Sequence, residues 1–288
     1  MISQETISGL KSWFTSYLKT FQSGDPDYQR NIDLKEEHTR RVCKEILDLG
    51  SSLSLDSEDL HLAEVIALFH DVGRFEQYAR YGTFSDPESE DHALLGVRVL
   101  RENGVLKTLD QKTRELILRT VSYHNRATLP AEETKTCLFF TKLLRDADKL
   151  DIWRVVTDYY REMNSVRNGV IELGLPDTPE ISQDVYTDMM AGRIVRTTCL
   201  KTLNDFKVLQ MGWIYDVNFP RTFQLVRERA YLKKIHDALP RTKKISEIYS
   251  AVQSYLEVNC LASPAGPIVP GPNPKNRLTK TVTSATIK

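Results

Sequence analysis

The sequence is short of three features: long apolar runs, an excess of one charge, and closely spaced cysteines. No run approaches the roughly 20 apolar residues that a membrane-spanning helix needs, so we expect no association with a membrane. The 39 basic residues balance the 39 acidic ones and no tract of a single sign stands out, so duplex nucleic acid is not an expected partner. The first residues lack a basic segment followed by an apolar stretch, so we expect no secretory signal.

The cysteines indicate a reducing environment. The chain has four of them, spread widely, and none forms a Cys-x-x-Cys pair. We therefore expect reduced thiols rather than disulfides or thiolate metal ligands, and a cytoplasmic protein. They are Cys43, Cys137, Cys199 and Cys260.

Apolar residues recur at helical spacing through most of the chain, which predicts an all-α fold. Gly50 and Gly73 are expected to close the second and third helices, and residues 169–173 to form a short extended piece. The expected helices cover residues 10–21, 36–49, 56–73, 90–103, 111–123, 133–158, 184–206, 221–238 and 245–256.

The chain is long enough for one large core, and we expect residues 1–262 to form a single helical domain. Within it, residues 184–259 would be a helical extension. The composition changes at Ser263, because five of the 12 prolines fall within the next 11 residues. Residues 263–288 are therefore expected to be a disordered tail.

The most informative feature is the pair His70–Asp71, which ends an apolar run that begins at Leu62. Adjacent residues lie about 100° apart around a helix axis, so in mid-helix the two side chains would not share a face. At a helix end the backbone can turn enough for both to reach one centre, and we expect Gly73 to supply that freedom.

Four further residues of metal-binding type lie on or beside apolar helical stripes: His38, His92, His124 and Asp148. A carboxylate on an apolar stripe is costly unless a cation or a hydrogen-bond donor neutralises it. One buried histidine is more often a satisfied core residue than a ligand, but six candidate ligands on inward faces favour a metal centre inside a helical bundle. Imidazole and carboxylate ligands without thiolate fit Fe, Mn, Zn, Ni or Co.

In these residues the chain resembles the HD-domain metal-dependent phosphohydrolase superfamily. The resemblance lies in the ordered residues His38, His70–Asp71 and Asp148, and it spans about 34–156, the expected metal-binding core. It implies an all-helical HD-domain bundle in which these residues bind one metal. Members with histidines at the positions of His92 and His124 bind a second metal, which the residue matching Asp71 bridges.

Asp146 competes with Asp148 as the last ligand, since the two residues point to nearly opposite faces of one helix. Both the apolar periodicity and the family's Ala-Asp-x-Leu pattern choose Asp148. Asp151 shares the face of Asp148 and is expected either to orient a ligand or to be an exposed carboxylate.

The expected activity is metal-dependent hydrolysis of a phosphate ester or anhydride, with a nucleotide as the favoured substrate. Two divalent cations, with Mg as a further candidate, would leave the site positively charged, suited to a metal-bound hydroxide and a phosphate group. Asp71 and Arg74 are the catalytic candidates, and Arg74, Arg126 and Lys149 the candidates for binding phosphate.

Two other readings stay open. Some HD-fold proteins hold a di-iron centre with similar ligands and oxidise their substrate with O₂, and a non-catalytic module stabilised by its metal is the remaining alternative. Residues 122–130 lack the Gly-Tyr-Pro element of the HD-GYP branch, so cyclic di-GMP hydrolysis is disfavoured.

Overall fold

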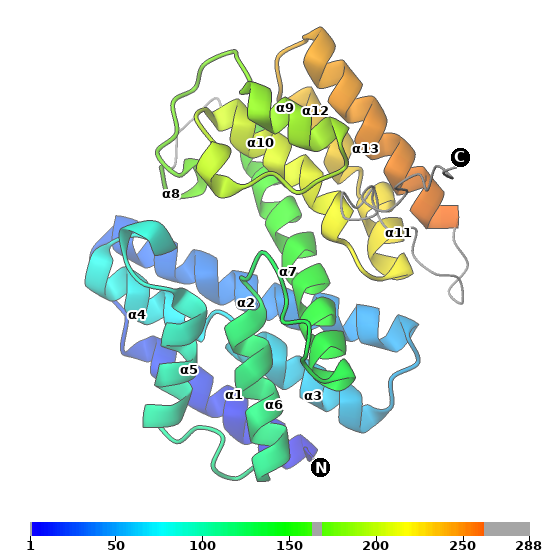
Figure 1. Cartoon of the computed structure of the whole chain (residues 1–288). Coiled ribbons are helices and arrows are strands. Elements are labelled where there is room, and N and C mark those ends of the chain that lie inside the picture. The colour runs from blue at the N-terminus through cyan, green and yellow to red at the C-terminus, as the bar shows by residue number, and fades with distance from the viewer. Residues whose placement is uncertain (1, 163–168, 262–288) are drawn as a thin grey trace, which may run out of the picture. The chain divides into compact units, whose positions relative to one another are not determined.

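The structure, a computed structural model, describes residues 2–162 and 169–261, and every regular element within these ranges is a helix, as the sequence predicts (Figure 1). The tail predicted at 263–288 lies outside the described residues. The α-helices are α1 (Gln4–Lys19), α2 (Pro26–Ser52), α3 (Ser57–Phe69), α4 (Val72–Tyr81), α5 (His92–Glu102), α6 (Gln111–Tyr123), α7 (Lys135–Glu162), α8 (Gly169–Glu172), α9 (Gln183–Met190), α10 (Leu203–Gly212), α11 (Pro220–Glu228), α12 (Tyr231–Asp237) and α13 (Lys243–Leu261).

The chain divides into two compact units, and the single helical domain expected over residues 1–262 stays a prediction. The first unit comprises the described residues of Met1–Gly174 and Gln224–Tyr231, and the second comprises those of Leu175–Phe223 and Leu232–Lys288. All six candidate metal ligands lie in the first unit, and most of the expected extension lies in the second. In the part of the chain that the structure describes, no helix is both long and apolar enough to cross a membrane.

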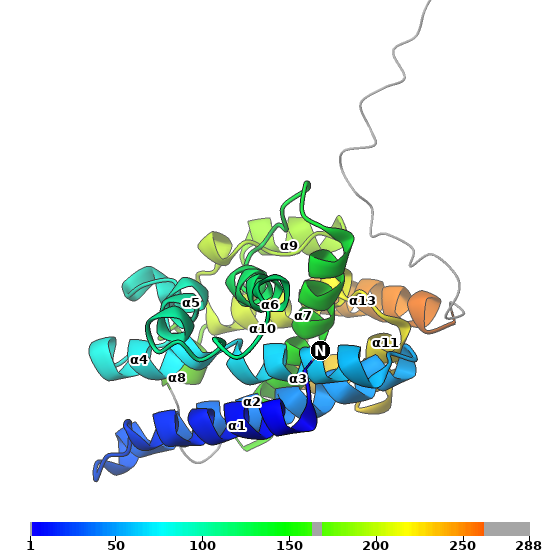
Figure 2. The same cartoon turned by 90° about the horizontal axis from the view of Figure 1, so that it is seen from below.

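The first unit is built around α2, which packs most extensively against α3 and α7, while α4 packs against α5. Figure 2 shows α1, α2 and α3 running alongside one another. Their inward faces meet in an apolar core whose largest side chains include Phe69, Phe75, Phe140 and Trp153, all almost completely buried. This burial fixes the helices that carry the candidate ligands.

The helix that bears His38 begins earlier than its apolar pattern indicates. The side chain of Asp25 accepts hydrogen bonds from the backbone amides of Asp27 and Tyr28, so α2 starts at Pro26. The prediction that Gly50 closes this helix is wrong, because α2 continues to Ser52. A Cβ atom at Gly50 would lie 2.8 Å from Leu60, so this glycine permits a close approach of side chains to α2.

The helix break at His70 differs from the predicted one, in which Gly73 closes the helix. Helix α3 ends at Phe69, and α4 begins at Val72, so Gly73 lies inside α4 instead of closing α3. Asp71 makes the turn itself, with φ −104° and ψ 14°. A Cβ at Gly73 would lie 2.3 Å from the carbonyl oxygen of His92 and 2.5 Å from the amide nitrogen of Gly96, so its role is to let α4 and α5 touch.

The second unit departs most from the expected boundaries. The single helix expected over 184–206 is divided into α9 and α10, because Gly192 takes a left-handed φ of 65° and Thr202 starts a new helix with a capping box to Asp205. The helix expected over 221–238 is interrupted at Ala230, whose φ is 53°. Residues 169–172 form the short helix α8 rather than an extended piece.

Candidate metal centre

The first unit brings all six predicted ligands together. His38 lies in the middle of α2, His70 and Asp71 occupy the junction of α3 and α4, and His92 is the first residue of α5. His124 directly follows α6, and Asp148 lies in α7. The four histidines and Asp71 are buried. Asp146 is buried too, whereas Asp148 is the aspartate of α7 whose Oδ1 lies 3.1 Å from Nε2 of His38 and 3.7 Å from Nε2 of His70.

The first cluster contains His38, His70, Asp71 and Asp148. The Nε2 atom of His38 lies 3.1 Å from Oδ1 of Asp148 and 3.6 Å from Oδ2 of Asp71. The Nε2 atom of His70 lies 3.7 Å from each of these oxygens. His38, His70 and Asp71 thus form a group that could hold one cation, and Asp148 lies beside it at the distances given.

The second cluster contains Asp71, His92 and His124. Oδ1 of Asp71 lies 3.4 Å from Nε2 of His92 and 3.6 Å from Nε2 of His124, and these two nitrogens are 3.0 Å apart. Asp71 therefore belongs to both clusters, with Oδ2 facing the first and Oδ1 facing the second. This is the arrangement of a carboxylate able to bridge two cations.

All four rings have their Nδ1 atom held by an acceptor. His70 and His124 each lie just past the end of a helix, and each Nδ1 donates to the backbone carbonyl three residues earlier, at 2.7 Å. The Nδ1 atom of His38 lies 2.7 Å from a carboxylate oxygen of Asp151. With the Nδ1 positions protonated, neutral rings point their Nε2 lone pairs into the centre.

The Nδ1 atom of His92 lies 2.7 Å from Asp86, a residue that the sequence analysis did not identify. Asp86 belongs to the loop 82–91, which joins α4 to α5. With Asp91 it also forms a third group of possible metal ligands around His92. Asp91, however, caps α5 by accepting from the amides of Ala93 and Leu94, so Asp86 is better placed to orient His92.

The Nε2 and carboxylate oxygen atoms of the two clusters are better arranged to bind a cation than to form hydrogen bonds with one another. The Nε2 atoms of His38 and His70 are 3.2 Å apart, at hydrogen-bonding distance, but when both rings are neutral and protonated at Nδ1 they offer only acceptors there. Burial lowers the pKa of His70 to about 4 and that of His92 to about 3, so both rings are neutral at pH 7. Oδ1 of Asp148 is buried without a hydrogen-bond partner.

The carboxylates keep their negative charge. Burial works against ionisation, but Lys35 and His70 hold the pKa of Asp71 well below its usual range, and His38 does the same for Asp148. Burial and Lys35 also oppose protonation of His38, yet the neighbouring carboxylates of Asp148 and Asp151 raise its pKa. The first cluster therefore attracts positive charge strongly.

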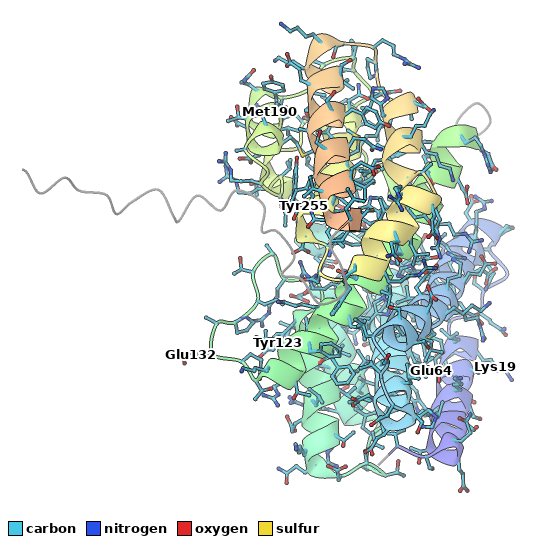
Figure 3. All side chains as sticks on the ribbon, turned by 90° about the vertical axis from the view of Figure 1, so that its right-hand side faces the viewer. Lys19, Glu64, Tyr123, Glu132, Met190 and Tyr255 are labelled. Carbon is cyan, nitrogen blue, oxygen red and sulfur yellow. The ribbon has the colours of Figure 1, made fainter. Side chains whose placement is uncertain are left out.

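Two arginines outside the clusters form hydrogen bonds that hold the ligands or their neighbouring segments in position. Arg41 donates two hydrogen bonds, of 2.5 and 3.1 Å, to the carboxylate of Asp151 that holds His38. Arg145 of α7 donates to the backbone carbonyls of His124 and Arg126, which lie in the segment after α6. Figure 3 labels Tyr123 at the end of α6, where this segment begins, and Glu132 farther along it.

The three cations predicted to bind phosphate have different surroundings. Arg74 lies beside the centre, its Nε 3.7 Å from Oδ1 of Asp71. Arg126 is exposed, with its guanidinium group over the ring of Tyr123. Lys149 is buried and donates to the backbone carbonyl of Arg145. Contact of these residues with a substrate stays a prediction.

Comparison with known families points to one domain type. The model of the HD domain matches residues 36–153, a range that contains all six candidate ligands. No curated protein and no solved structure matches the chain.

Proposed function

Because residues 36–153 form an HD domain, as the resemblance in the sequence indicates, we propose that this chain is a metal-dependent phosphohydrolase. It would cleave a phosphate ester or anhydride, with a nucleotide as the favoured substrate. The observation that carries the proposal is the position of Asp71. Its Oδ2 faces the pair His38 and His70, and its Oδ1 faces the pair His92 and His124.

Two divalent cations held by these residues would activate a water molecule and neutralise charge on a phosphate group. The first would be held by His38, His70, Asp71 and Asp148, and the second by Asp71, His92 and His124. The four imidazoles add no charge of their own when neutral, so the two aspartates would offset only half of the charge of two divalent cations. Such a site favours an anionic substrate.

Arg74 contributes to the shape of the site in this proposal. Its Nη1 donates to the side chains of Gln77 and Asp86 and to the carbonyl of Phe84, so it fastens the loop 82–91 beside the centre. Asp86 in turn fixes the ring of His92. A rigid supporting shell keeps ligands and substrate aligned, which is a major part of catalysis by positioning.

The test combines metal analysis with a screen of phosphate release from nucleotides in Mn, Co, Ni and Mg. We expect near two metals per chain and metal-dependent release of phosphate. Asp71→Asn keeps the shape of the side chain but removes its charge, and should lower activity at least a hundredfold, with loss of bound metal. Asp158→Asn, a half-exposed carboxylate of α7 that pairs with Arg161, is the matched control and should leave both unchanged.

The nitrogen-rich donor set also suits iron, which keeps a di-iron oxygenase as the second candidate. Protein loaded with iron that consumes O₂ and releases no phosphate would favour it over the hydrolase. Metal binding without either activity would favour a metal-stabilised binding module, and full activity of Asp71→Asn would contradict the phosphohydrolase proposal.

A further inference from the structure

Lys35 is the cation closest to the shared carboxylate, and the sequence analysis did not identify it. It lies on α2 three residues before His38, so both side chains share one face of the helix. Its Nζ atom is 2.8 Å from Oδ2 of Asp71, and its side chain is 18% exposed. The ring of Phe84, from the loop 82–91, lies 5.4 Å from this ammonium group.

Lys35 differs in its partner from Arg74 and Arg41, two other half-buried cations near the centre. Arg74 is paired with Asp86 at 2.9 Å, and Arg41 is paired with Asp151 through two hydrogen bonds. These two aspartates support histidines and would not themselves bind the metals. The anion that faces Lys35 is Asp71, the residue with the largest share in the proposed metal centre.

Cations in the clusters would compete with Lys35 for the carboxylate of Asp71. Oδ2 of Asp71 would then be drawn toward the cation between His38 and His70, and Lys35 would keep its positive charge beside that cation. An anion bound at the same place would offset the repulsion between them. An ammonium group on a long stem, with three rotatable donors, can turn from the carboxylate to a ligand without any change in the helix.

The charges of the site indicate which anion would fit. Of the charged side chains that face the ligands directly, the pairs Arg74–Asp86 and Arg41–Asp151 cancel, and Asp71, Asp148 and Lys35 remain. Two divalent cations would therefore bring the centre to a net charge of about +3. A terminal phosphate group carries about −1.5 to −2 at pH 7, whereas an internal phosphodiester carries a single negative charge. The dianion balances the site better.

We propose that Lys35 is a substrate-binding residue that holds the non-bridging oxygens of a terminal, dianionic phosphate group. The substrate class is then a phosphomonoester, such as a nucleoside monophosphate, or a terminal phosphate of similar charge, rather than a phosphodiester. This inference rests on the proposed phosphohydrolase function, and Lys35 acts by binding charge, not by transferring a proton.

The experiment compares Lys35→Gln, Lys35→Arg and the control Lys44→Gln, an exposed lysine on the same helix. The probes are p-nitrophenyl phosphate, a monoester, and bis(p-nitrophenyl) phosphate, a diester, with the Mn-loaded full chain. Lys35→Gln should lower kcat/KM for the monoester at least thirtyfold, mainly through KM, and change that for the diester less than about threefold. Lys35→Arg should recover part of the loss, and Lys44→Gln should match the wild type.

Titration calorimetry gives a readout that does not depend on turnover. Inorganic phosphate should bind the Mn-loaded Lys35→Gln protein at least ten times more weakly than the wild type, while the metal content stays equal. Loss of metal from this variant would overturn the inference, because Lys35 would then be a support of the clusters. Equal loss for both esters would overturn the assignment of a dianion.

The two proposals fail in different ways. If the wild type hydrolyses the monoester and Lys35→Gln does so equally well, the phosphohydrolase stands and the role of Lys35 is wrong. If neither ester is cleaved but phosphate binding depends on Lys35, the residue is an anion-binding group and the hydrolase assignment is wrong. If phosphate binds neither protein, the inference about Lys35 is overturned whatever the activity.

Discussion

Each histidine that faces Asp71 has its Nδ1 atom held by a hydrogen-bond acceptor. The kind of acceptor depends on where the histidine lies relative to its helix. His70 and His124 follow the ends of helices, where backbone carbonyls lack partners within the helix, and each ring donates to one of them. His38 and His92 use carboxylates, those of Asp151 and Asp86. Ligands held in this way lose little freedom when they bind a metal, and a carboxylate partner also makes the ring a stronger ligand.

The support of His38 can be tested with Asp151→Asn. This change keeps the size of a side chain that is almost completely buried but removes the charge that His38 and Arg41 share. We expect metal affinity in the first cluster to fall about ten- to a hundredfold, because the ring loses its charged partner. Titration with Co²⁺, followed by its absorption spectrum, measures the affinity of each cluster.

The second cluster shares no hydrogen bond with Asp151, so its affinity should change much less than that of the first. Asp158→Asn, which lies after Asp151 on the same helix, serves as the control and should bind metal as the wild type does. Unchanged affinity of both clusters in Asp151→Asn would show that Asp151 holds Arg41 without tuning His38.

At the scale of elements, most helices of the first unit follow from apolar spacing and capping residues. Helix α6 has the predicted bounds of 111–123, and Asp56 caps α3 as expected. The two predicted helix stops at Gly50 and Gly73 are wrong for the same reason: a glycine that ends a helix and one that lets another element approach look alike in a sequence. Only the packing of the neighbouring segments distinguishes them.

The close approach of α4 and α5 gives a prediction about Gly73→Ala. The added Cβ would lie 2.3 Å from the carbonyl oxygen of His92, and backbone atoms cannot give way as a side chain can. Separation of the helices should lower the free energy of unfolding by about 1–3 kcal/mol. It should also weaken metal binding, since Asp71 precedes α4 and His92 begins α5. Urea denaturation and metal titration measure the two effects.

Gly9→Ala is the matched control for this change. Gly9 lies inside α1, is exposed, and has nothing within 4 Å of an added Cβ. Alanine there should raise the free energy of unfolding by about 0.5–1 kcal/mol through its higher helix propensity. Equal effects of the two substitutions would mean that α4 and α5 do not require the glycine.

The site was predictable where residues of metal-binding type interrupt apolar stripes. His38, His70, Asp71, His92, His124 and Asp148 all do so, and the structure brings them together. Lys35 and Asp86 were missed because a lysine on a helix and an aspartate in a loop are ordinary surface residues in a sequence. The contact of Lys35 with Asp71 and that of Asp86 with His92 form only when the helices pack against each other. Lys35 carried one usable signal, its place on the same helical face as His38.

At the scale of the whole molecule, the proposed ligands join segments that are distant in sequence. Between His38 and Asp148 they tie together α2, the α3–α4 junction, α5, α6 and α7, all in the first unit. A ligand that binds only the folded state stabilises it, by about 2.7 kcal/mol when its free concentration is a hundred times its dissociation constant. The residues of the second unit provide none of the proposed ligands.

Metal should therefore protect the two units unequally, and hydrogen exchange followed by mass spectrometry measures this segment by segment. On addition of Mn²⁺ we expect slower exchange in α2, α5, α6 and α7, and little change in α9, α10 and α13. A chelator should reverse the effect, and Asp71→Asn should abolish it because both clusters lose their shared ligand. Equal protection of both units would mean that the metal stabilises the chain as one cooperative body, with the second unit unfolding only together with the first.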